Sequence, residues 1–267
     1  MHSAPGAPRP VRPEPVLSAT GLDAGYGSAL VVRGLGLVAG RGEIVAIVGP
    51  NGSGKSTLLK TLAGLVPVRG GTIVHDGVDV SAMPAEHRAK RGIAFVPQER
   101  EVFASLTVRE NLVMGGFALG RKALHEALER VFGAYPVLAR LEGSHAGRLS
   151  GGERKTLAMA RVMMASPTVV RLDEPTANLA PIPSAELLER EVPALARAGA
   201  TVVLVEQRAV QALAVADWAY VLVAGQVEID GSAREIAGRG DIGRMFLGAR
   251  ASNQGADEGA AGAESVR

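Results

Sequence analysis

The sequence contains no cysteine, and this absence excludes disulfides, thiolate zinc sites and iron–sulfur ligation. It also carries little net charge, because 29 lysines and arginines face 27 aspartates and glutamates and leave a formal charge of only +2. A nucleic-acid-binding chain is expected to carry a basic footprint, and this near balance argues against one. We also find no internal repeat.

Long hydrophobic runs are missing as well. Residues 1–15 are rich in proline, alanine and arginine and lack the apolar segment of a secretory signal, so we predict a disordered arm there. The most apolar longer stretch, residues 210–224, is interrupted by Gln211 and Asp217 and is too short to span a bilayer. If the chain works at a membrane, a partner must bring it there. Residues 249–267 are rich in alanine, glycine and glutamate, and we predict a disordered tail.

What is present is the composition of a globular protein, with 47% hydrophobic and 21% charged residues among 267. This length allows one large domain, or a domain with a subdomain, around a substantial core. Short apolar, β-branched runs alternate with helical patterns, which predicts an α/β fold.

A glycine-rich segment matching the pattern G-x-x-x-x-G-K-[ST] is the strongest single motif. It follows an apolar run at residues 44–48 that reads as a buried strand, and it opens a helix over residues 56–63. Such a turn aims unpaired backbone N–H groups and the positive end of a helix dipole at one point, which stabilises phosphate. The motif consists of Gly49, Pro50, Asn51, Gly52, Ser53, Gly54, Lys55, Ser56 and Thr57.

Polar side chains follow three other predicted strands. An apolar strand over residues 168–172 delivers Asp173 and Glu174, and Gln98 comes just after a strand at residues 93–96. A strand at residues 201–205 carries Glu206 and Gln207 at its tip. Ligands of open α/β sheets gather at the carboxyl ends of the strands, so we expect these groups to meet near the phosphate loop.

Helical patterning dominates from residue 107 to residue 165 and predicts a helical subdomain inserted between strands. Thr107 and Glu110 form a capping-box pattern at its start. Its last helix is preceded by Leu149, Ser150, Gly151, Gly152 and Glu153. With this string upstream of the strand that ends in Asp173 and Glu174, the chain resembles the ATP-binding-cassette ATPases over roughly residues 16–247.

The resemblance implies a phosphate-loop NTPase cassette of the α/β class. A RecA-like core is expected over residues 16–97 and 166–248, with an antiparallel β subdomain and a helical subdomain at about residues 98–165. It also implies that ATP and Mg²⁺ are the cofactors and that ATP is hydrolysed.

The family's pattern implies a role for each matching residue. Gly49 to Thr57 would bind the phosphates of ATP, and Tyr26 would stack on adenine, although taken alone Tyr26 is better explained as an ordinary turn tyrosine. Ser56 and Asp173 would hold Mg²⁺, and Gln98 would touch Mg²⁺ or the attacking water and sense the membrane subunit. Glu174 would polarise that water.

Residues 149–153 would bind the γ-phosphate of ATP held by a second cassette, so two cassettes sandwich two nucleotides head to tail. The second subunit is then a partner, with a heterodimer favoured and a homodimer open. Transmembrane permease subunits would place the chain at the cytoplasmic face of the plasma membrane, and a periplasmic or extracellular solute-binding protein would act indirectly. No nucleic-acid partner is expected.

Shorter strings resemble the ATPase subunits of branched-chain amino-acid importers, namely Pro97 to Arg100, Leu106 to Leu112, Met114 to Phe117, Leu179 to Pro181 and Val205 to Gln207. Urea and short-amide importers share these strings, so both solute classes stay open. A cassette acting mainly as an ATP-dependent structural switch beside a more active partner is a further alternative. A cassette ATPase acting on DNA or ribosomes is disfavoured, because the chain has one phosphate loop and no zinc cysteines.

Three positions depart from the general family pattern. Gln207 replaces a histidine and can donate a hydrogen bond to a γ-phosphate but cannot become cationic. Ala180 replaces an aspartate in the loop after the second carboxylate. Arg171 lies inside a strand that is apolar in the family, and because a buried unpaired arginine is costly, we expect it to be paired or to reach the surface.

Overall fold

The computed structural model describes residues 12–99 and 101–240 and is built on a six-stranded sheet in the order β10-β9-β3-β8-β7-β6. Its strands are β3 (Ile44–Val48), β6 (Ile93–Val96), β7 (Val169–Asp173), β8 (Thr201–Glu206), β9 (Trp218–Val223) and β10 (Gln226–Ser232). Five of them run parallel, and β10 pairs antiparallel with β9. Every residue of β3, β7 and β8 is buried, which explains why these strands are mostly apolar instead of alternating between apolar and polar residues.

Helices cover both faces of this sheet. One apolar cluster joins it to α1 and to the second sheet, and another joins it to helices that include α6, α8, α9 and α10. The covering elements outside the helical block are α1 (Lys55–Leu62), α2 (Ala85–Lys90), α7 (Pro181–Glu186), the π-helical turn η2 (Leu187–Glu191), α8 (Val192–Arg197), α9 (Ala209–Val215) and α10 (Ala233–Ala237).

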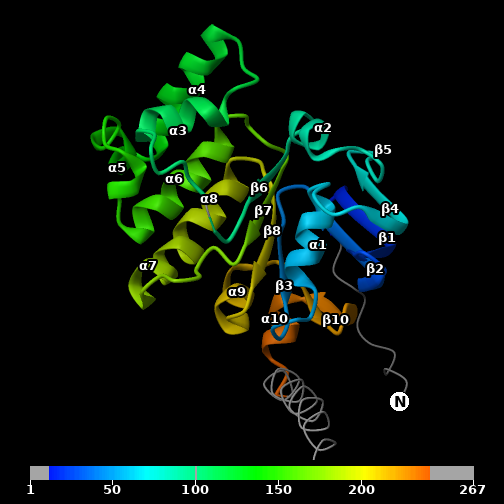
Figure 1. Cartoon of the computed structure of the whole chain (residues 1–267). Coiled ribbons are helices and arrows are strands. Elements are labelled where there is room, and N and C mark those ends of the chain that lie inside the picture. Colours follow the sequence, from blue (N-terminus) through cyan, green and yellow to red (C-terminus); the bar gives the residue numbers. More distant parts are fainter. Residues whose placement is uncertain (1–11, 100, 241–267) are drawn as a thin grey trace, which may run out of the picture.

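The second sheet is antiparallel and follows the order β2-β1-β4-β5. It consists of β1 (Pro15–Tyr26), β2 (Ala29–Gly40), β4 (Val68–His75) and β5 (Val78–Asp79). Strands β4 and β5 are joined by Asp76 and Gly77, both at positive φ, which is the backbone that an Asp-Gly hairpin turn requires. In Figure 1 this sheet lies on the side of the molecule opposite the helical block.

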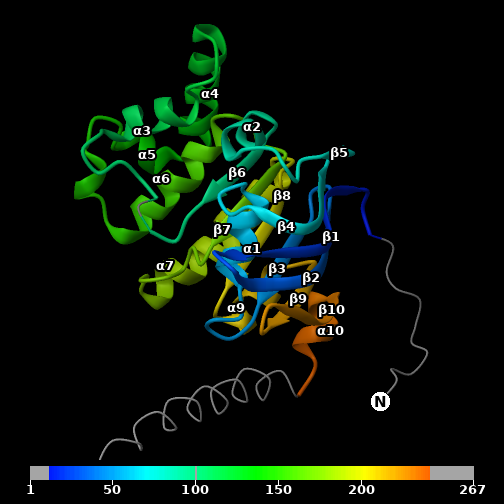
Figure 2. The ribbon, with the colours of Figure 1, turned by 45° about the vertical axis from the view of Figure 1, so that its right-hand side comes forward.

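The helical block is formed by α3 (Val108–Gly115), α4 (Arg121–Ala134), α5 (Pro136–Arg140), the 3₁₀ turn η1 (Ala146–Arg148) and α6 (Gly151–Met163). It has an apolar core of its own, built from side chains between Val108 and Met164. Thr107 caps α3 in a complete capping box with Glu110. Figures 1 and 2 both show the block at one end of the molecule, beyond the strand ends of the central sheet. The predicted α/β fold with an antiparallel sheet and a helical insertion is confirmed.

The predicted disordered arm extends too far toward the core. Pro15 already begins β1, and the Arg12 guanidinium forms an ion pair with Glu43 at 2.6 Å and lies over the Trp218 ring. These contacts fix residues 12–15 against the core, so the predicted boundary at residue 15 is wrong for this part. The rest of the arm, a short helix expected near residues 242–247 and the tail after residue 248 lie outside the described residues. Within the described ranges, no helix has the length and apolarity to cross a bilayer.

Arg171 is 1% exposed and therefore does not reach the surface. It is paired, but with carbonyl oxygens instead of a carboxylate: it donates to Ala94 and Leu59 at 3.2 Å and to Ile93 at 3.5 Å. Its guanidinium also lies 5.5 Å from the centre of the Phe95 ring. The cation is thus solvated by dipoles and an aromatic face.

Candidate functional site

The phosphate loop runs from the end of β3 to the start of α1 and has a backbone that only glycine allows at two positions. A Cβ atom on Gly49 would collide with the carbonyl oxygen of Leu222. Gly54 caps α1 in a left-handed conformation with φ 98°. Residues 51, 52 and 54–57 line a cavity of about 230 Å³ that also reaches Glu174. The loop therefore leaves an open cradle at the amino end of α1.

Lys55 lies across this cradle. It is 4% exposed, and its Nζ donates to the carbonyl oxygens of Gly49 at 2.8 Å and Pro50 at 2.9 Å. Burial lowers the pKa of Lys55, while Glu174, Asp173 and Glu206 oppose this shift. Ser53 adds a buried hydroxyl without a hydrogen-bond partner among the described residues. The buried Lys55 ammonium and the unpaired Ser53 hydroxyl are both suited to bind an anionic ligand such as a triphosphate.

Ser56 and Asp173 meet although 117 positions separate them in the chain. The Ser56 hydroxyl donates to Asp173 Oδ1 at 3.0 Å. Burial raises the pKa of Asp173, while this hydrogen bond and the charges of nearby lysines lower it by less. A hydroxyl and a carboxylate oxygen are hard ligands suited to Mg²⁺. The described residues contain no cluster of three or more His, Cys, Asp or Glu that could hold a metal. A magnesium ion here would therefore take further oxygens from nucleotide phosphates and water, as is usual for this ion.

Glu174 has an unusual backbone and a specific partner. Its φ is 46°, a left-handed value rare for a residue with a side chain, and its N–H donates to the Val205 carbonyl at 2.9 Å. Gln98 Nε2 donates to Glu174 Oε2 at 3.1 Å. Such strain persists only where the surroundings impose it, and it is common where a side chain must be aimed precisely.

Glu206 holds the turn that follows Glu174, a role that the sequence did not reveal. Its carboxylate is 2% exposed and accepts hydrogen bonds from the Thr176 N–H at 3.0 Å and the Thr176 hydroxyl at 2.8 Å. Burial raises the pKa of Glu206. The available signal was a carboxylate at the carboxyl end of a wholly buried strand, which requires a partner.

Two predicted site residues stay apart from this group. Gln207 follows Glu206 but is exposed and does not line the phosphate-loop cavity. Tyr26 ends β1 with a side chain that is 52% exposed and is likewise absent from the cavity lining. An open aromatic surface suits stacking on a base but equally suits a turn tyrosine, so both interpretations of Tyr26 remain.

The Ser-Gly-Gly string lies at a different place in the chain's own fold. Ser150 caps α6 in a capping box with Glu153, and Gly151 and Gly152 form the first helical positions. Leu149 is buried beneath them. Residues 150–153 line a second cavity of about 620 Å³ together with residues 178–180 of the loop after Glu174. This cavity and that of the phosphate loop share no lining residue.

Residues 32–177 match the ABC transporter family, and this stretch contains the phosphate loop, Gln98, the Ser-Gly-Gly string and both carboxylates. This chain belongs to the ABC transporter family. It is an ATPase cassette that binds and hydrolyses ATP, and cassettes of ABC transporters work with transmembrane components.

Relatives with transport names cover most of this cassette. A probable branched-chain amino acid transport ATP-binding protein, LivF, of Archaeoglobus fulgidus is 37% identical over 85% of this chain and 96% of the relative. The high-affinity branched-chain amino acid transport ATP-binding protein BraG of Pseudomonas aeruginosa is 41% identical over 76% and 86%. The lipopolysaccharide export ATP-binding protein LptB of Escherichia coli is 33% identical over 87% and 97%.

The three-dimensional fold agrees with this assignment. A crystal structure of the ADP conformation of an ATP-binding cassette superimposes with a TM-score of 0.78 and 25% identity, covering 88% of this chain and 99% of that one. Because the match covers 88% of this chain, the superposition supports the cassette fold over most of its length.

Proposed function

We propose that this cassette energises an importer for branched-chain or related amino acids through separate membrane permease subunits. The observation that supports it most is the convergence of Lys55, Ser56, Asp173, Gln98 and Glu174 at the carboxyl edge of the parallel sheet. This set supplies charge neutralisation, hard oxygen ligands and a carboxylate beside a carboxamide, which are the parts that phosphoryl transfer to water requires.

Each residue has a task in this proposal. Lys55 would leave its carbonyl partners to neutralise phosphate charge, and Ser56 with Asp173 would hold Mg²⁺, which supplies further neutralisation of the phosphates. Glu174 would orient and polarise water for in-line attack, and Gln98 would hold the Glu174 carboxylate in position. Gln207 would donate a hydrogen bond to the γ-phosphate, and Tyr26 would stack on adenine.

The separation of the two cavities supports a head-to-tail pair of cassettes. The first N–H groups of a helix have no partner within the helix, so those of Gly151 and Gly152 are suited to bind an anion. Because residues 150–153 and the chain's own phosphate loop line different cavities, the anion would be the γ-phosphate held by the partner cassette. A heterodimer with an unlike cassette is the arrangement that we propose first, with a homodimer as the alternative.

Short sequence strings and the names of two relatives support amino acids as the solute class. The V-E-Q and L-A-P strings resemble the amino-acid importer branch, and two of the relatives above carry branched-chain amino acid transport in their names. Within the structure, Ala180 is the N-cap residue of α7 and Pro181 is its first helical residue, so this loop lacks an acidic group at that point. Urea and short amides are the second solute class.

The transport proposal is tested by reconstitution. The chain is purified with the membrane proteins that hold it, placed in proteoliposomes, and supplied with the co-purifying solute-binding protein. We expect leucine, isoleucine or valine to stimulate phosphate release several-fold over the basal rate. Stimulation by urea or acetamide alone would assign the second solute class, and stimulation only by a lipid such as lipopolysaccharide would overturn the importer proposal.

A structural-switch cassette is the alternative, motivated by the exposed Gln207 and by Ala180. If the paired subunit does most of the hydrolysis, Gln207→His should raise the turnover of this chain, because an imidazole can both donate a hydrogen bond and become cationic near a γ-phosphate. We expect a rise of less than about tenfold under the leading proposal. The measurement is phosphate release by the isolated chain and by its assembly with the second cassette, and a robust rate for the isolated wild-type chain would exclude the switch.

A further inference from the structure

Lys155 connects two elements that serve different nucleotides. It lies on α6, the helix that begins with the Ser-Gly-Gly string, and is only 5% exposed. Its Nζ donates to the main-chain carbonyl of Gln98 at 2.9 Å and lies 3.7 Å from Glu101 Oε1. A buried ammonium with one strong carbonyl bond and one looser ion pair is held mainly by the backbone at Gln98.

Gln98 carries this connection on to the hydrolytic carboxylate. While its carbonyl accepts from Lys155, its side-chain amide donates to Glu174 at 3.1 Å. Gln98 therefore contacts α6 through its backbone carbonyl and positions Glu174 with its side chain. Any shift of α6 along its axis is passed to Glu174 through two hydrogen bonds.

We propose that Lys155 is a positioning residue that couples the two nucleotide sites of the cassette pair. The inference rests on the proposed function, in which residues 150–153 engage the partner's ATP and Glu174 acts on the chain's own ATP. When the partner's ATP seats α6, Lys155 sets the backbone at Gln98, and the Gln98 amide then aims Glu174. Hydrolysis at one site thereby depends on occupation of the other.

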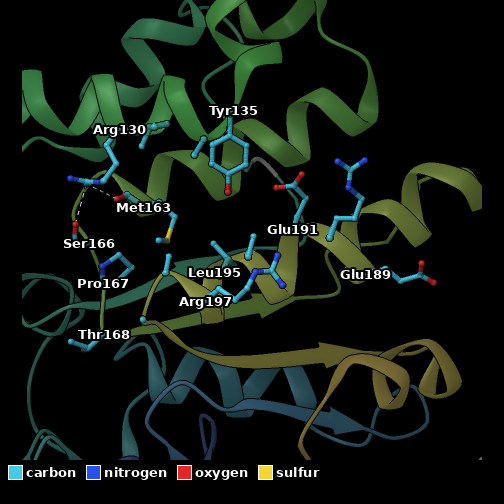
Figure 3. Close-up of a pocket in the computed structure, with 16 residues that line it drawn as sticks. Arg130, Tyr135, Met163, Ser166, Pro167, Thr168, Glu189, Glu191, Leu195 and Arg197 are labelled. Carbon is cyan, nitrogen blue, oxygen red and sulfur yellow. Dashed lines mark hydrogen bonds between the residues drawn. The ribbon is translucent and has the colours of Figure 1, made fainter.

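A second contact of α6 provides a matched control. Arg130, on α4, donates from Nη2 to the Ser166 hydroxyl at 3.1 Å and to the Met163 carbonyl at the end of α6 at 3.3 Å. Figure 3 shows Arg130 and Ser166 joined in this way at the wall of a cavity of about 610 Å³. This contact involves the same helix but does not touch Gln98, and Arg130 lines neither the phosphate-loop cavity nor that of the Ser-Gly-Gly string.

The test compares Lys155→Met, Lys155→Arg and Arg130→Met in the full chain, assembled with the second cassette that supports its turnover. For Lys155→Met we expect kcat to fall about tenfold, because loss of positioning misaligns Glu174, and the Hill coefficient for ATP to fall toward 1. The affinity of the unassembled chain for a fluorescent ATP analogue should stay within about twofold, since Lys155 lines neither cavity. Lys155→Arg keeps a cationic donor and should recover most of both losses.

The controls separate coupling from simple structural support. Arg130→Met should leave the Hill coefficient unchanged even if its melting temperature falls. Glu101→Gln removes the looser ion pair but keeps the Gln98 bond, so it should resemble wild type. An unchanged kcat and Hill coefficient in folded Lys155→Met, or equal losses in Arg130→Met, would overturn the inference. If the wild-type cassettes do not associate when ATP is added, the proposed function itself is wrong.

Discussion

Replacing Glu174 with glutamine is expected to reduce ATP turnover by about 100-fold or more while ATP still binds. The carboxamide has the shape of the carboxylate and can still accept the hydrogen bond from Gln98, so the turn at φ 46° should persist. It cannot carry the negative charge that polarises water. The nucleotide should therefore stay intact and hold two cassettes together.

Phosphate release measures the loss of turnover, and size-exclusion chromatography with ATP and Mg²⁺ measures whether two cassettes stay together. Glu126→Gln is the matched control, because Glu126 is an exposed glutamate on α4 far from the sheet edge, and it should behave as wild type. Turnover retained by Glu174→Gln would remove Glu174 from the hydrolytic step. Lost turnover without a nucleotide-stabilised dimer would instead argue against the head-to-tail sandwich.

Arg88→Met is expected to destabilise the fold by about 3 kcal/mol or more. Arg88 is 1% exposed and donates four hydrogen bonds of 2.8 to 3.0 Å. The acceptors are main-chain carbonyls at the carboxyl end of α1 and in the segment before α2, namely Thr61, Leu62, Ser81 and Met83. Methionine fills part of the volume but leaves the Leu62, Ser81 and Met83 carbonyls without the donors that Arg88 supplies, while the Thr61 carbonyl keeps a bond from the Gly64 N–H at 2.9 Å.

Arg171→Met is the matched comparison, and we expect it to be neutral or stabilising by about 1–2 kcal/mol. Its three carbonyl bonds are longer, at 3.2 to 3.5 Å, and the Leu59 carbonyl already accepts from Ala63. Burial, reinforced by the charge of Arg88, lowers the pKa of Arg171 to about 9. The charged guanidinium therefore costs stability in the folded state, and an apolar side chain removes that cost.

The pH dependence gives this comparison a second readout. Because the folded pKa of Arg171 lies below its value in the unfolded chain, the unfolded chain binds more protons above about pH 9. The Arg171 penalty is thus fully present below about pH 9 and is lost as pH rises further. Urea unfolding of both variants at pH 7 and pH 10 measures it, and a greater loss of stability for Arg171→Met than for Arg88→Met would contradict the argument.

Much of the fold could be predicted because its signals are local. The buried strands at residues 44–48 and 169–173 are short and mostly apolar, and the capping box at Thr107 and the Asp76-Gly77 turn depend only on neighbouring residues. The arm boundary was wrong, and the partners of Arg171 could not be named although its pairing was confirmed; both cases have one cause. The arm boundary and the surroundings of Arg171 both depend on contacts with residues distant in sequence, namely Glu43 and Trp218 in one case and carbonyls of β6 and α1 in the other.

By itself the sequence determined that this protein binds phosphate, because the order of glycines, Lys55 and Ser56 dictates the backbone and charges of the loop in any fold that accepts it. Only the tertiary structure decided how the other groups meet. Parallel strands ending at one edge bring Asp173 to Ser56 and Glu174 to Gln98, and the packing of α6 brings Lys155 to the Gln98 backbone. These contacts join residues between 57 and 117 positions apart, and no local pattern encodes distances of that kind.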